Sequence, residues 1–269
     1  MKTCKNSQIE KIVFILGCGR SGTSILGTSL SYHPRITYLH EPRHLWCTCY
    51  PETDIWRPMA IERKGKLVLT AKDVREADSH RLRMLFLKQT IKTAKPIIVE
   101  KLPINNFRLP FIYTIFPEAN FIHILRNGIE VAKSIEKRVP FGWFGYNNYK
   151  WNLLVDYAHS QSHTSEIVNV CTNNYERGLL EWRLSVEAIY SFTSTIPKES
   201  FFEITYDDFI DNPLEIMQKI LNFIGLEKSN EVNNFLINNI QSGSNKVAST
   251  EYSEKDKIIG GSFLQKKFI

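Results

Sequence analysis

Long apolar segments are missing from this sequence. Near the amino terminus the longest one covers residues 12–16, far short of the roughly 20 residues that span a bilayer. A secretory signal is not expected either, since it needs an apolar region of about 7–15 residues and a cleavage site. The 5 cysteines form an odd, unpatterned set, which favours free thiols in a reducing compartment. We therefore expect a soluble, cytoplasmic protein without a membrane span.

A strong excess of one charge is missing as well. The chain has 34 Lys and Arg against 28 Asp and Glu, and this net charge of +6 suits an anionic ligand without separating a small anion from nucleic acid. With 43% hydrophobic and 23% charged residues, the composition excludes a disordered, collagen-like or coiled-coil chain. A length of 269 residues suits one core, so we expect a single domain over residues 1–269.

Short apolar segments alternate with segments of helical periodicity. Residues 43–65 suggest an irregular loop or lid, and residues 139–173 suggest an inserted lid or acceptor element. The alternation predicts an α/β fold, a P-loop-like three-layer arrangement with a central parallel sheet flanked by helices. Strands are expected at residues 11–16, 36–39, 97–99, 120–125 and 201–205, and helices at 23–32, 73–94, 106–116, 128–138, 175–196 and from a capping Asn212 before Pro213.

A glycine-rich segment joins the first expected strand to the following helix. Glycines let the backbone turn sharply and point several N–H groups inward, and the helix amino terminus adds partial positive charge. Strand, loop and helix in this order favour binding of a phosphate-like anion over an ordinary turn. The candidate binding residues are Gly19, Arg20, Ser21, Gly22, Thr23 and Ser24.

The loop departs from the nucleoside-triphosphate motif G-x-x-x-x-G-K-[ST]. Gly17, Gly22 and Ser24 fit the motif, but Thr23 stands where the motif has its lysine. No obvious side chain then reaches the β- and γ-phosphates of ATP, and the cation lies inside the loop as Arg20. A P-loop kinase is therefore disfavoured, and a different phosphate-bearing donor is expected.

A second strand, turn and helix carry a second set of candidate anion ligands. Arg126 follows the strand at 120–125, at the edge where open α/β sheets bind ligands. Ser134 lies about two turns into the next helix, and Arg138 is four residues further along the same face. Together these three side chains can hold a second phosphate through charge-assisted hydrogen bonds.

The two motifs resemble those of the sulfotransferases that use 3′-phosphoadenosine 5′-phosphosulfate (PAPS). Residues 20–24 resemble the 5′-phosphosulfate loop of that family, and Arg126 with Ser134 at a spacing of eight is similar to its 3′-phosphate motif. The resemblance covers residues 11–226 outside the 139–173 insertion. It includes His33-Pro34, Glu41-Pro42, Lys101-Leu102-Pro103, Phe116-Pro117, Tyr206-Asp207-Asp208-Phe209, Asn212-Pro213 and residues 223–226.

The resemblance implies roles for particular residues. By similarity to tyrosylprotein sulfotransferases, Arg20, Glu41 and Lys101 are the catalytic arginine, base and lysine. The same similarity makes Arg126, Ser134, Arg138 and Tyr206 nucleotide contacts. Residues 38–42 are closer to carbohydrate sulfotransferases, and Ser249-Thr250 with Lys255 is similar to a late catalytic and nucleotide-binding segment.

The implied reaction is an in-line attack of an acceptor hydroxyl on sulfur, with loss of 3′,5′-phosphoadenosine. Arg20 and Lys101 would stabilise charge on the leaving phosphate, and Glu41 or its neighbour His40 would take the acceptor proton. No metal is expected, because the His and Cys residues at 40–49 and 159–163 lack a zinc-binding spacing. A P-loop kinase and a non-catalytic binder of phosphoadenosine nucleotides remain the alternatives.

Six aromatic residues with no regular period gather early in the insertion. They fit either an apolar plug or a wall that holds an acceptor, since aromatic faces suit sugar rings, phenols and lipid chains. Sparse flanking charge disfavours a nucleic-acid partner. We expect a hydroxyl-bearing acceptor, a carbohydrate or glycolipid before a phenol, and we expect Trp143 to serve the acceptor and spare the donor. The six residues are Phe141, Trp143, Phe144, Tyr146, Tyr149 and Trp151.

Overall fold

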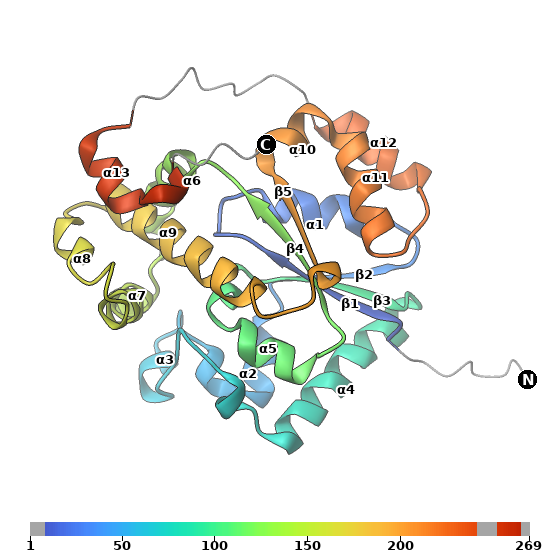
Figure 1. Cartoon of the computed structure of the whole chain (residues 1–269). Helices are drawn as coiled ribbons and strands as arrows, with labels where there is room; N and C mark the ends of the chain where they lie inside the picture. Colours follow the sequence, from blue (N-terminus) through green and yellow to red (C-terminus); the bar gives the residue numbers. More distant parts are fainter. Residues whose placement is uncertain (1–8, 241–251, 265–269) are drawn as a thin grey trace, which may run out of the picture.

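The computed structural model describes residues 9–240 and 252–264 of the chain. Five parallel strands form a single sheet in the order β2-β3-β1-β4-β5 (Figure 1). The expected α/β fold with a central parallel sheet flanked by helices is confirmed. The strands are β1 (Lys11–Leu16), β2 (Ile36–His40), β3 (Ile97–Lys101), β4 (Asn120–Leu125) and β5 (Phe201–Thr205).

Helices cover both faces of the sheet. One face carries α1 (Thr23–Ser31), α10 (Tyr206–Asp211), α11 (Pro213–Phe223) and α12 (Asn230–Asn239). The other helices lie on the opposite side of the sheet. They are α2 (Arg43–Cys49), α3 (Met59–Glu62), α4 (Glu76–Thr93), α5 (Leu109–Ile115), α6 (Gly128–Glu136), α7 (Tyr149–Ser160), α8 (Ile167–Val170), α9 (Asn174–Thr193) and α13 (Glu254–Gly260). Short 3-10 turns occupy Pro51–Thr53, Ala71–Asp73, Pro103–Phe107, Val139–Phe141, Tyr146–Asn148, Lys198–Ser200 and Ser262–Leu264.

The central strand β1 contacts the helices on both faces of the sheet. It pairs with β3 on one side and β4 on the other, so both of its faces are covered. Successive side chains point to opposite faces of a strand, and Val13 and Ile15 therefore join the core under α1 and α11, while Phe14 and Leu16 join the core under α4 and α9. The glycine-rich loop that follows Leu16 consequently starts from a rigid base.

Phe14 provides a test of this core. Its side chain is fully buried, and the centroid of its ring lies 5.7 Å from the ring centroid of Phe116 and 5.8 Å from that of Phe121. We expect Phe14→Ala to lower the free energy of unfolding by about 3–5 kcal/mol, because it leaves a cavity between packed rings. Urea denaturation measures the change. The control Phe141→Ala, at a side chain that is 78% exposed, should change it by less than about 0.5 kcal/mol.

The segment expected to be an irregular loop at residues 43–65 is largely ordered, and that expectation is wrong. It contains α2, a 3-10 turn and α3, and its residues Leu45, Trp46 and Cys49 are buried on one side of α2. The Trp46 indole N–H donates to Glu100 Oε1 at 3.0 Å. Tertiary burial of this one-sided pattern stabilises a helix that the mixed Pro, Trp and Cys composition obscured.

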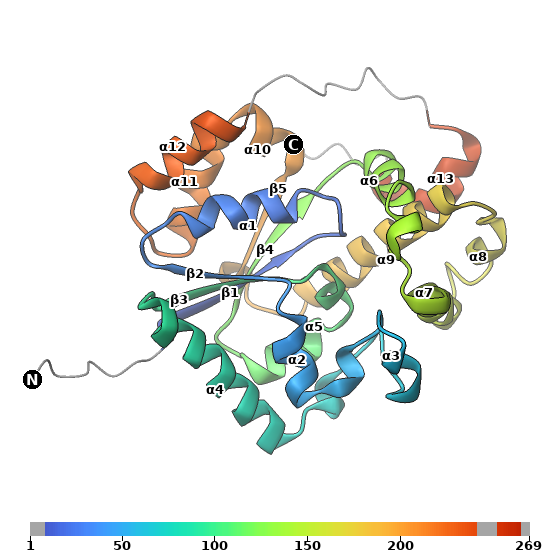
Figure 2. The ribbon, with the colours of Figure 1, turned by 180° about the vertical axis from the view of Figure 1, so that it is seen from behind.

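Three other details can be compared with the expectations from sequence. The helix expected at 106–116 begins only at Leu109, because residues 103–107 form a 3-10 turn that ends before Pro110. Helix α11 starts at Pro213 as expected, but the side chain of Asn212 makes no capping hydrogen bond. The 139–173 segment holds α7 and α8, and its residues 145–149 pack against residues 55–65, so α7 and α3 lie side by side in Figure 2.

Candidate active site

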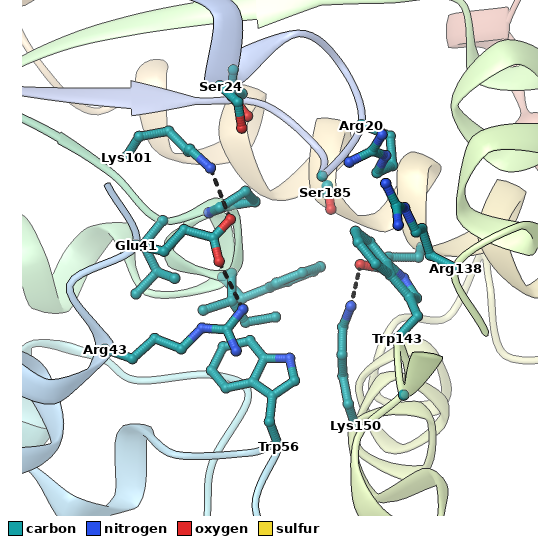
Figure 3. A pocket seen from close by; sticks show the side chains of 18 of the residues that line it. Arg20, Ser24, Glu41, Arg43, Trp56, Lys101, Arg138, Trp143, Lys150 and Ser185 are labelled. Carbon is teal, nitrogen blue, oxygen red and sulfur yellow. Dashed lines mark hydrogen bonds and ion pairs between the residues drawn. The ribbon is translucent and has the colours of Figure 1, made fainter. Parts of the chain in front are cut away.

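A cavity of about 320 Å³ lies at the carboxyl ends of β1, β2 and β3. Its walls include Arg20 from the loop after β1, Glu41 from the residue after β2, and Lys101 at the end of β3. Trp143 and Lys150 of the 139–173 segment close the side that faces Glu41 (Figure 3). Parallel strands end at the same edge of a sheet, and for this reason residues far apart in the chain meet here.

The glycine-rich loop presents free backbone donors to an anion. Its start is held by the Gly17 N–H, which donates to Asn106 Oδ1 at 3.2 Å. Helix α1 then begins after Gly22, which is left-handed at φ +95° and provides no side-chain cap. The first N–H groups of α1 therefore have neither an intrahelical partner nor a cap, and they can donate to a bound phosphate or sulfate.

Gly22 provides a test of this loop. A Cβ built at Gly22 would lie 2.4 Å from the Tyr206 ring, and the positive φ disfavours any side chain. We expect Gly22→Ala to weaken binding of adenosine 3′,5′-bisphosphate, the same compound as 3′,5′-phosphoadenosine, about tenfold or more, because the loop must move. Calorimetry measures the affinity. Gly225→Ala is the matched control, since its φ is +73° but its Cβ would meet only the Lys11 Nζ at 3.6 Å; equal losses in both variants would contradict the argument.

The two anion motifs meet at Arg20. The Arg20 Nε donates to Ser134 Oγ at 3.0 Å, and the Arg126 Nη1 donates to the backbone oxygen of Arg20 at 3.2 Å. The Arg126 guanidinium also lies over the Tyr206 ring, 4.2 Å from its centroid. Burial, together with the charges of Arg138 and Arg126, lowers the pKa of Arg20. Three arginine charges are therefore concentrated here, on the exposed Arg20 and Arg138 and on the half-buried, stacked Arg126, and they form a site for an anion.

Arg138 and the remaining loop residues take two positions. Arg138, Gly19, Thr23 and Ser24 line the cavity, as Arg20 does. Ser21 is buried, and its N–H donates to the Cys18 backbone oxygen at 3.0 Å. Arg126, Ser134 and Tyr206 are outside the cavity walls and contact the loop itself. The structure thus brings both predicted sets together around one loop.

Glu41 and Lys101 form an ion pair in the cavity. The Lys101 Nζ donates to Glu41 Oε1 at 2.8 Å, and the Glu41 N–H donates to the Lys101 backbone oxygen at 2.8 Å. The Arg43 Nη2 donates to the other carboxylate oxygen of Glu41, also at 2.8 Å (Figure 3). Glu41 has a left-handed backbone at φ +46°, which few non-glycine residues adopt. The turn after β2 therefore carries strain at the residue that faces the cavity.

These contacts set the charge states of both groups. Burial acts to raise the pKa of Glu41, but the hydrogen bond from Lys101 and the charges of Lys101 and Arg43 outweigh it and lower the pKa. Burial lowers the pKa of Lys101, whose side chain is 1% exposed, against the opposing effect of Glu41. Glu41 is therefore ionised at neutral pH and able to accept a proton.

His40 takes a different position from its neighbour. The side chain is exposed and is absent from the cavity walls, although it follows Tyr38 on the same strand face with ring centroids 5.9 Å apart. Partial desolvation of the ring by its neighbours, together with the nearby charge of Lys101, lowers the pKa of His40. The geometry thus favours Glu41 over His40 as the group that faces a reacting hydroxyl.

Among the residues of this site that sequence reasoning did not identify, four form two interacting pairs. Arg43 stacks on Trp56 at 3.8 Å from the ring centroid, and Lys150 pairs with Glu181 at 2.6 Å. All four side chains line the cavity. One feature of the sequence could have indicated the second pair. Glu181 stands between Leu180 and Trp182 in an apolar helical segment, and a charged residue in such a segment is buried only when it has a partner of opposite charge.

The aromatic cluster of the insertion divides between its two expected roles. Phe144 and Trp151 are buried and pack together at 5.5 Å between ring centroids, as a plug would. Phe141 and Trp143 line the cavity, as an acceptor wall would. The Trp143 ring also lies against Gly19 of the donor loop, where a Cβ would be 2.5 Å from it. The expectation that Trp143 serves the acceptor and spares the donor stays a prediction, and this contact with Gly19 is the reason to measure both.

The remaining expectations concern the tail, metals and membranes. Lys255 pairs with Glu176 at 2.5 Å, while Ser249 and Thr250 lie outside the described residues. Within residues 9–240 and 252–264, no cluster of three or more His, Cys, Asp or Glu side chains could hold a metal ion. In the same part of the chain, no helix is both long enough and apolar enough to cross a membrane.

Comparison with known proteins identifies the family. The model of the sulfotransferase family matches residues 13–230, which is most of the chain. A protein of Caenorhabditis briggsae named "Putative protein-tyrosine sulfotransferase" is 23% identical over 227 residues, covering 84% of this chain and 69% of that protein. The chain belongs to the sulfotransferase family and is a sulfotransferase enzyme.

Solved structures agree on the fold. The sulfotransferase domain from the curacin biosynthetic pathway superposes with a TM-score of 0.55 at 15% identity, covering 84% of this chain and 77% of that one. The sulfotransferase domain from the olefin synthase of Synechococcus PCC 7002 gives a TM-score of 0.51 at 18% identity, with coverage of 97% and 84%. At these identities the likeness shows the fold alone.

Proposed function

We propose that the enzyme transfers the sulfuryl group of PAPS to a hydroxyl acceptor. The observation that carries this proposal is the meeting of both anion motifs on Arg20, in a cavity that also holds the Glu41–Lys101 pair. A donor with phosphate groups at both ends of one adenosine needs two anion sites at a fixed separation. The loop of residues 19–24 suits the 5′-phosphosulfate, and Arg126, Ser134, Arg138 and Tyr206 suit the remainder of the nucleotide.

The proposed chemistry uses protein groups as acid, base and electrostatic partners. The acceptor oxygen forms a bond to sulfur while the bond from sulfur to the bridging phosphate oxygen breaks, and 3′,5′-phosphoadenosine leaves with that electron pair. The hydroxyl proton passes to Glu41, which is ionised at neutral pH. Arg20 and Lys101 stabilise the charge that grows on the leaving oxygen. His40 is the neighbouring base, but its side chain is outside the cavity walls.

For the acceptor, we propose a carbohydrate or glycolipid hydroxyl. The support is the cavity wall, where Trp56, Trp143 and Phe107 offer aromatic faces of the kind that stack on sugar rings. A phenolic hydroxyl is the second candidate, and the similarity to the C. briggsae protein, which is named for protein-tyrosine, favours it. Both candidates need the same attack on sulfur, so the choice between them concerns the wall and not the reaction.

The same proposal includes one domain and a cytoplasmic location. The family match over residues 13–230 supports a single sulfotransferase domain. The place of Phe141 and Trp143 in the cavity wall supports the 139–173 segment as its acceptor element. Cys18, Cys47, Cys49 and Cys171 are free thiols in the structure, which suits a reducing compartment.

Incubation with PAPS and a panel of saccharides, glycolipids and phenols tests the proposal. We expect release of 3′,5′-phosphoadenosine together with one sulfated product. Transfer of phosphate from ATP–Mg²⁺ to an acceptor would instead support a P-loop kinase. Tight calorimetric binding of PAPS without turnover on any acceptor would support a non-catalytic binder, and sulfation of phenols but not of sugars would replace the carbohydrate assignment.

A further inference from the structure

A buried polar cluster lies on the cavity wall opposite Glu41. It includes Trp143 and Lys150, which lie next to each other (Figure 3). The Lys150 Nζ on α7 pairs with Glu181 Oε1 on α9 at 2.6 Å, and the Trp143 indole N–H donates to Glu181 Oε2 at 2.8 Å. The side chains of Lys150 and Glu181 are 4% and 5% exposed. The ammonium also lies 4.4 Å from the centroid of the Trp143 ring. One carboxylate therefore holds two side chains of the 139–150 segment, Trp143 and Lys150, that line the cavity.

The segment between α6 and α7 is irregular, and contacts with other elements help to hold it. Gly142 and Gly145 are left-handed, and so are Asn147 and Asn148 at φ +50° and +57°. A backbone with repeated left-handed residues forms no continuous helix, and its own backbone hydrogen bonds close local turns, such as those from Phe141 N–H to the Arg138 oxygen and from Gly145 N–H to the Gly142 oxygen, both at 3.0 Å. The Tyr146 N–H donates to the Trp56 backbone oxygen at 2.9 Å, and Glu181 supplies the side-chain contacts on the other side.

Trp143 passes this ordering to the donor loop. Its ring contacts Gly19 so closely that a Cβ at residue 19 would lie 2.5 Å from Trp143 Cη2 and 2.9 Å from Cζ2. The indole thus covers the segment of the loop that precedes Arg20. A rigid aromatic ring in this position limits how far the loop can move away from the bound anion.

A buried ion pair contributes little net stability in general, because removal of both charges from water offsets their attraction. The arrangement instead fixes the direction of two side chains, and this is the property that a site needs. We propose that Glu181 is a positioning residue: it holds Trp143 against Gly19 and thereby stabilises the donor loop in its nucleotide-binding conformation. The proposal rests on the proposed function, since it takes adenosine 3′,5′-bisphosphate as the nucleotide.

Two matched double variants test the proposal by calorimetry with adenosine 3′,5′-bisphosphate. Glu181→Leu with Lys150→Met removes both charges and also the acceptor for the indole N–H. We expect the dissociation constant to rise about fivefold or more, because the indole then leaves its site rather than remain unsatisfied. Glu181→Gln with Lys150→Met removes the same charges but keeps an oxygen for the indole, so the constant should stay within about twofold of that of the unmodified protein.

The melting temperatures separate positioning from folding. Both double variants should melt within about 4 °C of the unmodified protein, because neither leaves a buried charge unpaired. Trp143→Leu, at a half-buried side chain that the fold tolerates, should also raise the constant about fivefold or more. Glu187→Gln is the control. Glu187 lies on the same helix as Glu181, but it pairs with Arg183 on that helix and with His163.

Equal constants in the two double variants would overturn the proposal, whether both are weakened or both unchanged. An unchanged constant in Trp143→Leu would also overturn it. Absence of nucleotide binding by the unmodified protein would instead reject the proposed function itself, so the two failures are distinguishable.

Discussion

Replacing Lys101 by methionine is expected to lower kcat about 10²–10³-fold. The Lys101 Nζ is buried at the end of β3 and lines the cavity beside Arg20, so its charge acts where water cannot screen it. Removal of one such donor at a growing negative charge typically costs about 3–4 kcal/mol of transition-state stabilisation. Methionine keeps the length and the apolar contacts of the side chain. Release of 3′,5′-phosphoadenosine at saturating PAPS and acceptor measures the effect.

The control for this prediction lies at the opposite end of the same strand. Lys95 precedes β3, and its Nζ donates to the backbone oxygen of His33, away from the cavity. Lys95→Met should leave kcat within about twofold of its original value. A kcat in Lys101→Met that stays within about tenfold would show that the ammonium does not stabilise the leaving group.

Glu41→Gln is expected to lower kcat about 10²–10⁴-fold, with a much smaller change in nucleotide affinity. Glutamine keeps the size of the side chain and an oxygen for Lys101, but it cannot take the acceptor proton. The pair of measurements is kcat with a sulfated acceptor and the dissociation constant of adenosine 3′,5′-bisphosphate. A kcat close to the original value would transfer the role of base to another group, with His40 the first to test.

The pH profile provides a separate test of the same residue. Burial alone would raise the pKa of Glu41, but Lys101 and Arg43 hold it below its usual range, so the carboxylate stays ionised as the pH falls. The acidic limb of kcat/KM should therefore lie below the usual glutamate range. Arg43→Gln removes one of the two cations and should move this limb to higher pH. A limb that stays in place after Arg43→Gln would mean that another group controls it.

The sequence predicted the sheet and the donor loop because both depend on local patterns. All five strands were expected from short apolar segments, and β1, β4 and β5 have the expected bounds. The loop at residues 17–24 was expected from its glycines. Two of these, Gly17 and Gly22, have positive backbone φ angles of +143° and +95°. Such features need only neighbouring residues, so a single sequence contains them.

The helix at Arg43–Cys49 could not be predicted in the same way. Its helical conformation depends on burial of Trp46 against Glu100 and of Cys49 in the core, which local composition does not reveal. Local composition also does not reveal the environments of the two charged side chains at the end of β3. Glu100 points into the core, where burial raises its pKa to about 8, and the adjacent Lys101 points into the cavity.

By itself, the sequence determined the α/β class, the order of the strands along the chain, both anion motifs and the resemblance that named Arg20, Glu41 and Lys101. The tertiary structure alone decided that Arg20 contacts Ser134, that Arg43 shares the carboxylate of Glu41, and that Glu181 joins Lys150 to Trp143. The physical reason is the range of the interactions. Strand, turn and helix signals come from residues a few positions apart, whereas these contacts join residues that only the packing of helices and strand ends brings within hydrogen-bonding distance.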